Sequence, residues 1–356
     1  MKYRKISLVL AMMLAASLTS CGSKDKKAED TSAAEENTVE KISPNSIVFD
    51  WQESYGNILS EFASSADHTD DSRFDLVDLN SDGTPELVIS PGTDPSSACS
   101  IYTFSDGTAV KAGEEGSKGE FSYIPEKEVC HSLYAGDTFD IGEYFQLTDS
   151  KLVPVMKYYS SYAINDGEST TFEIDDESVT RKEFEEARAE YTSVTDISVG
   201  RRYTFAATAV DYALHYSESW QAVMTKEQKQ LYADKLGEYI EIEYPNGAFE
   251  LCDINGDDLP ELIFSTGTYE ADVCRIFTID DSSGHAALSE VSGDYGGFGT
   301  IGFDIDGKVI FAETAEGQKC WDITGTDLGA YTSSGSTMVC GRKYFLSSTN
   351  ITAVLN

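Results

Sequence analysis

The stretch FDLVDLNSDGTPELVIS (74–90) occurs a second time in this chain, as FELCDINGDDLPELIFS (249–265). A constant shift of 175 positions superposes the two copies with nine of seventeen residues identical. This internal repeat predicts two related domains, each built around an acidic turn between two apolar strands. The register continues without insertion through further matched pairs: Gly92 with Gly267, Cys99 with Cys274 and Thr103 with Thr278.

The rest of the chain has the pattern of short strands with a few helices. Apolar residues at spacings of three and four predict a helix at 51–65 and another after Thr225, each ahead of one copy of the repeat. Short apolar runs separated by turn residues such as Asp106-Gly107 predict antiparallel meanders. We therefore expect an α+β fold of two related domains, each an antiparallel sheet with a covering helix.

Three further predictions concern the segments outside the repeat. Thr180 followed by Glu183 has the spacing of a capping box, which predicts a short helix through Tyr191. The apolar segment 203–217 fits either a strand or a helix. After the glycine-rich segment 293–303, the second domain is expected to be β-rich to its end.

The N-terminus has the layout of a secretory signal. Basic residues precede an apolar run, Ile6 to Ala16, that is too short to span a membrane. The following LTSC at 18–21 resembles the lipobox of bacterial lipoproteins, in which the cysteine is lipidated. The resemblance implies a signal peptide at 1–20 and a lipid anchor on Cys21; an ordinary signal peptide with a chance cysteine is the alternative.

Residues 21–46 form the next segment, which is polar and has no aromatic side chain. Such a segment cannot bury enough apolar surface to offset the entropy of ordering, so it is predicted to be a disordered tether from the lipidated cysteine. The remaining length favours two domains, a first at 47–217 and a second at 218–356. The expected location is the cell membrane, with the folded part facing the extracellular or periplasmic side.

The chain is strongly acidic. It has 26 Lys and Arg residues against 62 Asp and Glu residues, a formal net charge of −36. Nucleic acids and anionic lipid surfaces would be repelled, so contact with the membrane is expected through the lipid anchor only. Divalent cations and basic ligands are the favoured partners.

Both copies of the repeat place oxygen donors on alternate residues of a tight turn. Such donors converge on one point, as a calcium ion with about six to eight oxygen ligands requires. Asx-turns that hold the hairpin without any metal are the alternative. The candidate ligands are Asp78, Asn80, Asp82, the Thr84 carbonyl and Glu86 in the first turn, and Asp253, Asn255, Asp257, the Leu259 carbonyl and Glu261 in the second.

The pattern Asp-x-Asn-x-Asp-Gly resembles the opening of EF-hand and dockerin calcium loops. Counted from Asp78 or Asp253 as position 1, each loop has an acidic residue at position 9, followed by Leu and an apolar strand. This resembles integrin-α-type (FG-GAP) hairpin loops more closely, because position 12 holds Ile89 or Phe264 where an EF-hand has glutamate. The whole layout is similar to bacterial surface lipoproteins of unassigned function, which implies location and not activity. Asp258 replaces Gly83 in the second turn and is expected to adopt the left-handed conformation.

Six cysteines follow Cys21, and an even number outside the membrane favours disulfides. Free cysteines buried in strands are the alternative, since cysteine packs as a small apolar side chain. The expected pairs are Cys99 with Cys130, Cys274 with Cys320, and Cys252 with Cys340.

The sequence contains no recognised nucleophile elbow, phosphate-binding loop or dinucleotide fingerprint, and its four histidines are scattered. We therefore expect an exported calcium-binding surface protein that acts as a non-catalytic binding or adhesion module for a protein or glycan. The alternative is a cell-envelope or polysaccharide hydrolase, or its accessory factor, and inert spacers are a third possibility. A cleft lined by paired carboxylates and aromatic side chains would favour the enzyme.

Overall fold

The structure is a computed structural model, and the ranges that it describes leave out the N-terminal segment. The predicted signal peptide, lipid anchor and tether therefore lie outside the described residues. Lys41–Asn356 forms one compact unit. The described ranges are 48–162, 169–193, 196–217, 220–242, 244, 246–280, 284–314, 317–329 and 338–355.

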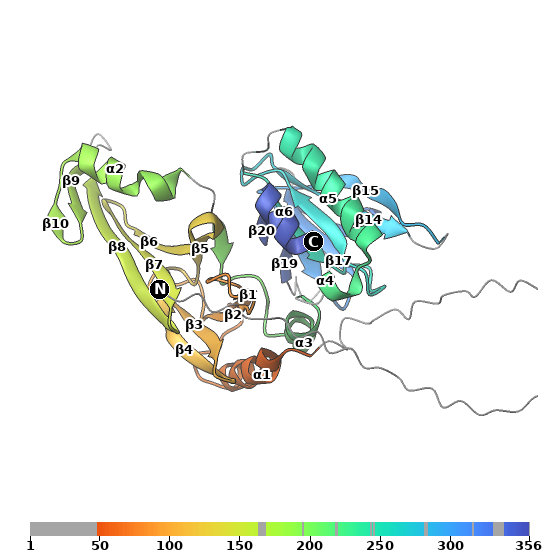
Figure 1. The fold of residues 1–356 in the computed structure, drawn as a ribbon, viewed down its shortest axis with the longest axis horizontal. Helices are drawn as coiled ribbons and strands as arrows, with labels where there is room; N and C mark the ends of the chain where they lie inside the picture. The colour runs from red at the N-terminus through yellow and green to blue at the C-terminus, as the bar shows by residue number, and fades with distance from the viewer. Residues whose placement is uncertain are drawn as a thin grey trace, which may run out of the picture. The chain divides into compact units, whose positions relative to one another are not determined.

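The described strands form four sheets (Figure 1). Every strand pair within these sheets is antiparallel. Helices pack against the sheets and share buried clusters with them. The fold class is α+β, as the sequence predicts.

The first sheet holds the first copy of the repeat. The predicted helix is α1 (Asp50–Ala63), and its Tyr55 and Leu59 lie in the same buried cluster as apolar side chains of the first two strands. Tyr55 also fixes the helix to the turn, because its hydroxyl donates to the Pro85 carbonyl at 2.9 Å. The strands follow in chain order: β1 (Arg73–Val77), β2 (Glu86–Ser90), β3 (Cys99–Ser105) and β4 (Thr108–Glu115).

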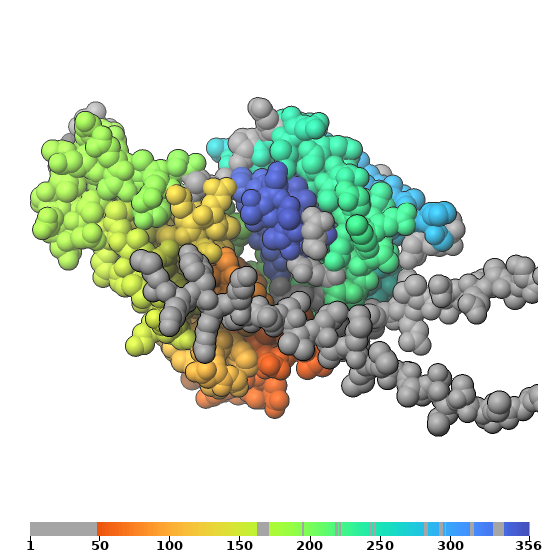
Figure 2. Space-filling view, in the orientation of Figure 1, coloured from red at the N-terminus to blue at the C-terminus, as the bar shows by residue number. Residues whose placement is uncertain are grey.

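The second sheet has the order β10-β9-β8-β7-β6-β5-β11. Helix α2 (Arg181–Thr192) begins at the predicted capping box, in which Thr180 and Glu183 hydrogen-bond to each other's backbone N–H groups. Phe184 packs this helix onto the sheet, and α2, β9 and β10 are seen at the surface in Figure 2 (yellow-green). The strands are β5 (Phe121–Ile124), β6 (Val129–Ala135), β7 (Phe139–Thr148), β8 (Lys151–Tyr162), β9 (Ser169–Ile174), β10 (Glu177–Ser178) and β11 (Ile197–Val199), with a 3₁₀ turn, η2 (Pro125–Lys127), between β5 and β6.

The third and fourth sheets contain the second half of the chain. Helix α5 (Lys226–Glu241) starts at Thr225, as predicted, and its Tyr232 hydroxyl donates to the Pro260 carbonyl at 2.8 Å. The third sheet, β15-β14-β13-β12-β20, consists of β12 (Ala248–Cys252), β13 (Glu261–Ser265), β14 (Val273–Asp280), β15 (Ala287–Gly296) and β20 (Tyr344–Phe345). The fourth sheet, β18-β17-β16-β19, consists of β16 (Ile301–Asp304), β17 (Val309–Thr314), β18 (Gly317–Asp322) and β19 (Met338–Cys340).

Three helices resolve or correct the sequence predictions. In the ambiguous segment, Tyr203 makes one β-bridge to Phe74 and one to Met338, and helix α3 (Ala207–His215) follows. A short helix, α4 (Trp220–Val223), precedes α5. The prediction that the second domain is β-rich to its end is wrong, because the chain closes with helix α6 (Ser348–Leu355). The β-branched residues of α6 favour a strand, but packing of its buried apolar side chains against α5 outweighs this preference.

One buried cluster includes Tyr55 from the first half of the chain and Tyr232 from the second. The predicted boundary between residues 217 and 218 adjoins two residues outside the described ranges. Within those ranges, no helix is both long enough and apolar enough to cross a membrane.

Candidate functional site

The acidic turn of the first hairpin folds back onto its own backbone. Asp78 accepts hydrogen bonds from the N–H groups of Asp82 at 3.2 Å and Gly83 at 2.9 Å. Asn80 accepts from the Asp82 N–H at 3.1 Å, and Asp82 accepts from the Thr84 N–H at 2.8 Å. Three of the predicted ligand side chains therefore gather over one turn, in the Asx-turn geometry that the sequence allows as the metal-free alternative.

The second turn repeats this geometry. Asp258 has a φ of 68°, beside 86° for Gly83, so the predicted left-handed conformation is confirmed. The second turn therefore keeps the same kind of side-chain to backbone hydrogen bonds, although Asp258 stands where the first turn has glycine. The hydrogen bonds are from the Asp258 N–H to Asp253 at 3.1 Å, from the Asp257 N–H to Asn255 at 2.8 Å and from the Leu259 N–H to Asp257 at 2.9 Å.

The predicted ligands at position 9, Glu86 and Glu261, are buried beneath the turns. Glu86 accepts from the Leu79 N–H at 2.8 Å and from the Thr103 hydroxyl at 3.0 Å. Burial raises the pKa of both Glu86 and Glu261 to about 8. Each carboxyl group closes the base of its hairpin. The matching contacts of Glu261 are the Ile254 N–H at 2.9 Å and the Thr278 hydroxyl at 3.1 Å.

The donor set of each turn fits calcium in part. Among the described residues, no group of three or more Asp, Glu, His or Cys side chains is placed to hold a metal ion. In the first turn Glu86 is already engaged, which leaves two aspartates, one asparagine and the Thr84 carbonyl as hard oxygen donors. Calcium binding by these donors, and by their counterparts in the second turn, stays a prediction.

Sequence reasoning missed a buried ion network between the two hairpins. Asp75 and Glu250 occupy the same position in the two copies of the repeat. Arg202 lies between them: its Nε donates to Asp75 at 3.2 Å, and its Nη1 donates to Glu250. Burial alone would lower the pKa of Arg202, but the Glu250 and Asp75 carboxylates raise it above its ordinary value. The arginine stays charged between two carboxylates.

The signal that could have revealed this network is a second repeat, GRRY at 200–203 and GRKY at 341–344, related by a shift of 141. The glycine of each copy has a positive φ, and a Cβ on it would lie 2.9 Å from a cysteine sulfur: Cys99 of β3 for Gly200, and Cys274 of β14 for Gly341. Both positions therefore require glycine. Each glycine also donates its N–H to an acid of the network: Gly200 to Asp75 at 3.2 Å and Gly341 to Glu250 at 2.7 Å.

The six cysteines predicted to form disulfides are free and buried. The sulfur atoms of Cys252 and Cys340 lie 3.9 Å apart, whereas a disulfide requires about 2.05 Å. The expected pairs Cys99–Cys130, Cys274–Cys320 and Cys252–Cys340 are therefore not formed in the described structure. The thiols pack as small apolar side chains.

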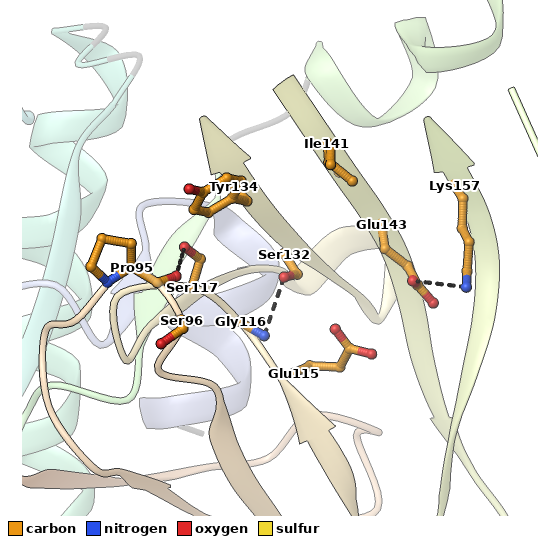
Figure 3. Close-up of a pocket in the computed structure, with 11 residues that line it drawn as sticks. Pro95, Ser96, Glu115, Gly116, Ser117, Ser132, Tyr134, Ile141, Glu143 and Lys157 are labelled. Atoms are coloured by element: carbon orange, nitrogen blue, oxygen red, sulfur yellow. Dashed lines mark hydrogen bonds and ion pairs between the residues drawn. The ribbon is translucent and has the colours of Figure 1, made fainter. Parts of the chain in front are cut away.

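An open hollow of 370 Å³ lies between the second sheet and the loops that flank β3 and β4 (Figure 3). Two contacts join its walls: the Gly116 N–H donates to the Ser132 hydroxyl at 3.2 Å, and the Ser117 hydroxyl donates to the Pro95 carbonyl at 3.0 Å. The floor is formed by β6, β7 and β8, so its side chains are set by strand register.

That register places two rows of side chains on one face of the sheet, because residues two apart on a strand share a face. The ring of Phe139 lies 5.9 Å from that of Tyr134 and 6.3 Å from that of Tyr159, which extends the apolar row along the face. The apolar row is Tyr134, Ile141 and Tyr159, and the polar row is Ser132, Glu143 and Lys157.

The hollow is acidic. Glu143 pairs with Lys157 at 3.4 Å, and the carboxylate of Glu115 lies beside them (Figure 3). Burial and, second, the charge of Glu143 raise the pKa of Glu115 above its ordinary value. Two carboxylates and one ammonium group leave the hollow with a local negative charge when all three are ionised.

No protein-family model, curated protein or solved structure matches this chain.

His131 is the histidine most deeply involved in the sheet. Its Nε2 lies 2.8 Å from the Tyr158 hydroxyl, and its ring stacks on Tyr144 with centroids 4.4 Å apart. The guanidinium of Arg188, from α2, lies 3.9 Å from the centre of the Tyr158 ring. Burial and, second, the charge of Arg188 lower the pKa of His131 to about 4. These contacts give His131 a packing role between α2 and the sheet.

Proposed function

We propose that the protein is a non-catalytic binding module whose ligand is a glycan lying on the hollowed face of the second sheet. The observation that carries this proposal is the apolar row beside the polar one. Tyr134 is 39% exposed and Ile141 is 49% exposed, although both lie within the sheet. Apolar side chains with a few placed polar groups are the usual lining of a binding site.

A glycan fits this lining because its sugar rings have apolar faces and polar edges. The faces would stack on Tyr134 and Tyr159, and the hydroxyl groups would bond to Glu143 and Ser132. Because the hollow is acidic, a neutral or amino sugar is favoured over an acidic one. A protein ligand with a basic, apolar surface is the other outcome that a binding screen would reveal.

We also propose that the module is exported and held at the cell membrane through Cys21, with calcium bound by the two acidic turns. The order of charged, apolar and small residues ahead of Cys21 supports the first part. The gathering of Asp78, Asn80 and Asp82 over one turn supports the second, because the two aspartates are negatively charged and all three side chains offer oxygen ligands to a divalent cation. Calcium would supply structural charge neutralisation there.

We infer further that residues 47–217 and 218–356 are two related domains. The matching tyrosine contacts to Pro85 and Pro260 support this, as do the matching glutamate contacts beneath the two turns. The second sheet would then be an insertion between the hairpin and the GRRY segment of the first domain.

The hydrolase has one specific observation in its favour, which is that Glu115 and Glu143 share one hollow with Tyr134. Paired carboxylates are the catalytic groups of most glycoside hydrolases. Release of reducing sugar from a polysaccharide, lost in both Glu115→Gln and Glu143→Gln, would establish the enzyme.

A glycan array probed with the protein tests the binding module. We expect retention on a subset of neutral or amino-sugar glycans, without turnover of the bound glycan. Tyr134→Ala should abolish retention, whereas Tyr269→Ala, at a tyrosine that is exposed elsewhere, should not. Equal retention of the two variants would contradict the proposed site.

A further inference from the structure

A second cavity, of 230 Å³, lies beside the buried Arg202 network. Three arginines line it, Arg201, Arg202 and Arg342, together with the carboxylates of Asp75 and Glu120. Arg202 is neutralised by its two carboxylate partners. The other two guanidinium groups therefore decide what this cavity can bind in a protein whose net charge is −36.

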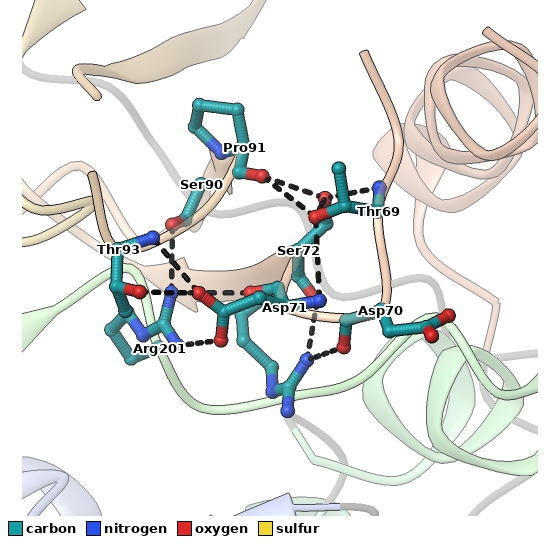
Figure 4. A network of polar contacts seen from close by, with 9 residues as sticks. Thr69, Asp70, Asp71, Ser72, Ser90, Pro91, Thr93 and Arg201 are labelled. Atoms are coloured by element: carbon teal, nitrogen blue, oxygen red, sulfur yellow. Dashed lines mark hydrogen bonds and ion pairs between the residues drawn. The ribbon is translucent and has the colours of Figure 1, made fainter. Parts of the chain in front are cut away.

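Arg201 is neutralised by a carboxylate of its own (Figure 4). Its Nη2 donates to the Asp71 carboxylate at 2.9 Å, and its Nη1 donates to the Asp71 carbonyl and to the Ser90 hydroxyl. Hydrogen bonds from Thr93 and then from Arg201 lower the pKa of Asp71 to about 2. The pair stays ionised at neutral pH.

Arg342 is the equivalent residue of the second GR motif, and it repeats these contacts except for the carboxylate. Its Nη1 donates to the carbonyls of Asn246 at 3.0 Å and Gly267 at 2.8 Å, and to the Ser265 hydroxyl at 3.0 Å. Asn246 stands at the shift of 175 from Asp71, where the first half has its acid. Within the described ranges, Arg342 forms no ion pair.

The acids whose charge acts on Arg342, and Glu120 in the wall of the same cavity, are engaged elsewhere or exposed. Asp272 accepts from the Thr266 hydroxyl at 3.0 Å and from the Tyr269 N–H at 2.8 Å. Glu120 accepts from Ser198 at 2.9 Å and is exposed, as is Asp196. Burial lowers the pKa of Arg342, and the charges of Asp272 and Asp196 counter this effect only in part.

We propose that this cavity binds a small anion through a carboxylate or phosphate group, with Arg342 as the main partner and Arg201 at its side. The planar guanidinium presents parallel N–H donors that match either group. The cavity is smaller than the roughly 300–1,000 Å³ of sites for drug-sized ligands, so the anionic group belongs to a small molecule or to the end of a larger one.

Isothermal titration with sodium phosphate and sodium acetate at constant ionic strength tests this proposal, with vesicles containing phosphatidic acid as a separate arm. The decisive variant is Asn246→Asp, which keeps Arg342 and supplies the carboxylate found in the first half. We expect it to weaken anion binding about tenfold or more, since a hydrogen bond to a charged group is worth about that factor. Arg342→Gln should do the same.

The reciprocal variant, Asp71→Asn, frees Arg201 and should strengthen binding several-fold. Binding of phosphate or acetate that Asn246→Asp weakens about tenfold or more identifies a soluble anion, and binding of vesicles alone, with the same loss, identifies a lipid headgroup. Absence of binding by the wild-type protein in every arm, or equal binding by wild type and both Arg342→Gln and Asn246→Asp, would overturn the proposal. Urea midpoints within experimental error of wild type would show that the variants are folded.

Discussion

Arg202→Met removes the cation that lies between the two repeated acids and leaves a side chain of similar length. The Asp75 and Glu250 side chains are each 2% exposed, and that of Arg202 is 7% exposed. Without the guanidinium, the two buried carboxylates lose the cation to which they are hydrogen-bonded, and Asp75 keeps only the charge of the buried Lys343 nearby. The variant therefore tests how much the two halves of the chain depend on this one residue.

Breaking a buried ion pair by removing one partner costs about 3–5 kcal/mol. The control is Arg201→Met, because the Arg201 and Asp71 side chains are 23% and 45% exposed and water can take over their interactions. Exposed pairs contribute about 0–1 kcal/mol. We therefore expect the free energy of unfolding to fall by about 3 kcal/mol more in Arg202→Met than in Arg201→Met.

Urea unfolding followed by circular dichroism and by the fluorescence of the buried Trp51 and Trp220 gives both free energies. The deficit of Arg202→Met should be smaller at pH 5 than at pH 8, because burial raises the pKa of Asp75 and its protonation removes a carboxylate charge that has lost its arginine partner. Equal losses in the two variants at pH 8, or a deficit that grows as the pH falls, would refute the reasoning.

Three further predictions concern the sheet and the turns. The folded-state pKa of His131, about 4, lies below its ordinary 6.5, so the unfolded chain binds more protons between these values and stability should fall as pH drops through this window. Between pH 6.5 and pH 4, the free energy of unfolding measured in urea should fall by up to about 3 kcal/mol more in the wild-type protein than in His131→Phe. Parallel pH profiles of the two proteins would contradict this. Gly142→Ala places a Cβ 2.1 Å from the Tyr158 ring and should cost about 1–3 kcal/mol by overpacking; an unchanged urea midpoint would refute it. Calcium should raise the melting temperature at constant ionic strength, and Asp78→Ala and Asp253→Ala should each reduce that rise. A melting temperature that does not change with calcium would contradict calcium binding by the two turns.

The hairpins and the capped helices could be predicted because their causes are local. Thr180 and Glu183 are three residues apart, and the acidic turn at Asp78 has its hydrogen-bond partners within five residues. The C-terminal helix could not be predicted in this way. Its β-branched residues favour a strand, and only contact with α5 selects the helix.

The two cavities depend on pairings that no local pattern contains. Arg202 meets Asp75 across 127 positions of sequence, so the GRRY segment gives no sign of its partner until the chain is folded. Likewise, Glu143 and Lys157 face one hollow only because β7 and β8 pair in one register, with an irregularity at Tyr144 that shifts it. A search for repeats at a shift of 141 positions would have found the GRRY and GRKY segments, but it would not have shown that Asp75 and Glu250 are their partners.

The binding of a cell-envelope polysaccharide tests the central proposal most directly. The measurement is the dissociation constant for a polysaccharide that contains a glycan to which the protein binds in the array. It is compared between the wild-type protein, Tyr134→Ala and Tyr269→Ala. The proposal predicts at least a tenfold weaker affinity for Tyr134→Ala and an unchanged affinity for Tyr269→Ala, because a buried aromatic contact is worth more than about 1.4 kcal/mol. Equal affinities of all three proteins would show that the hollow on the second sheet is not the binding site.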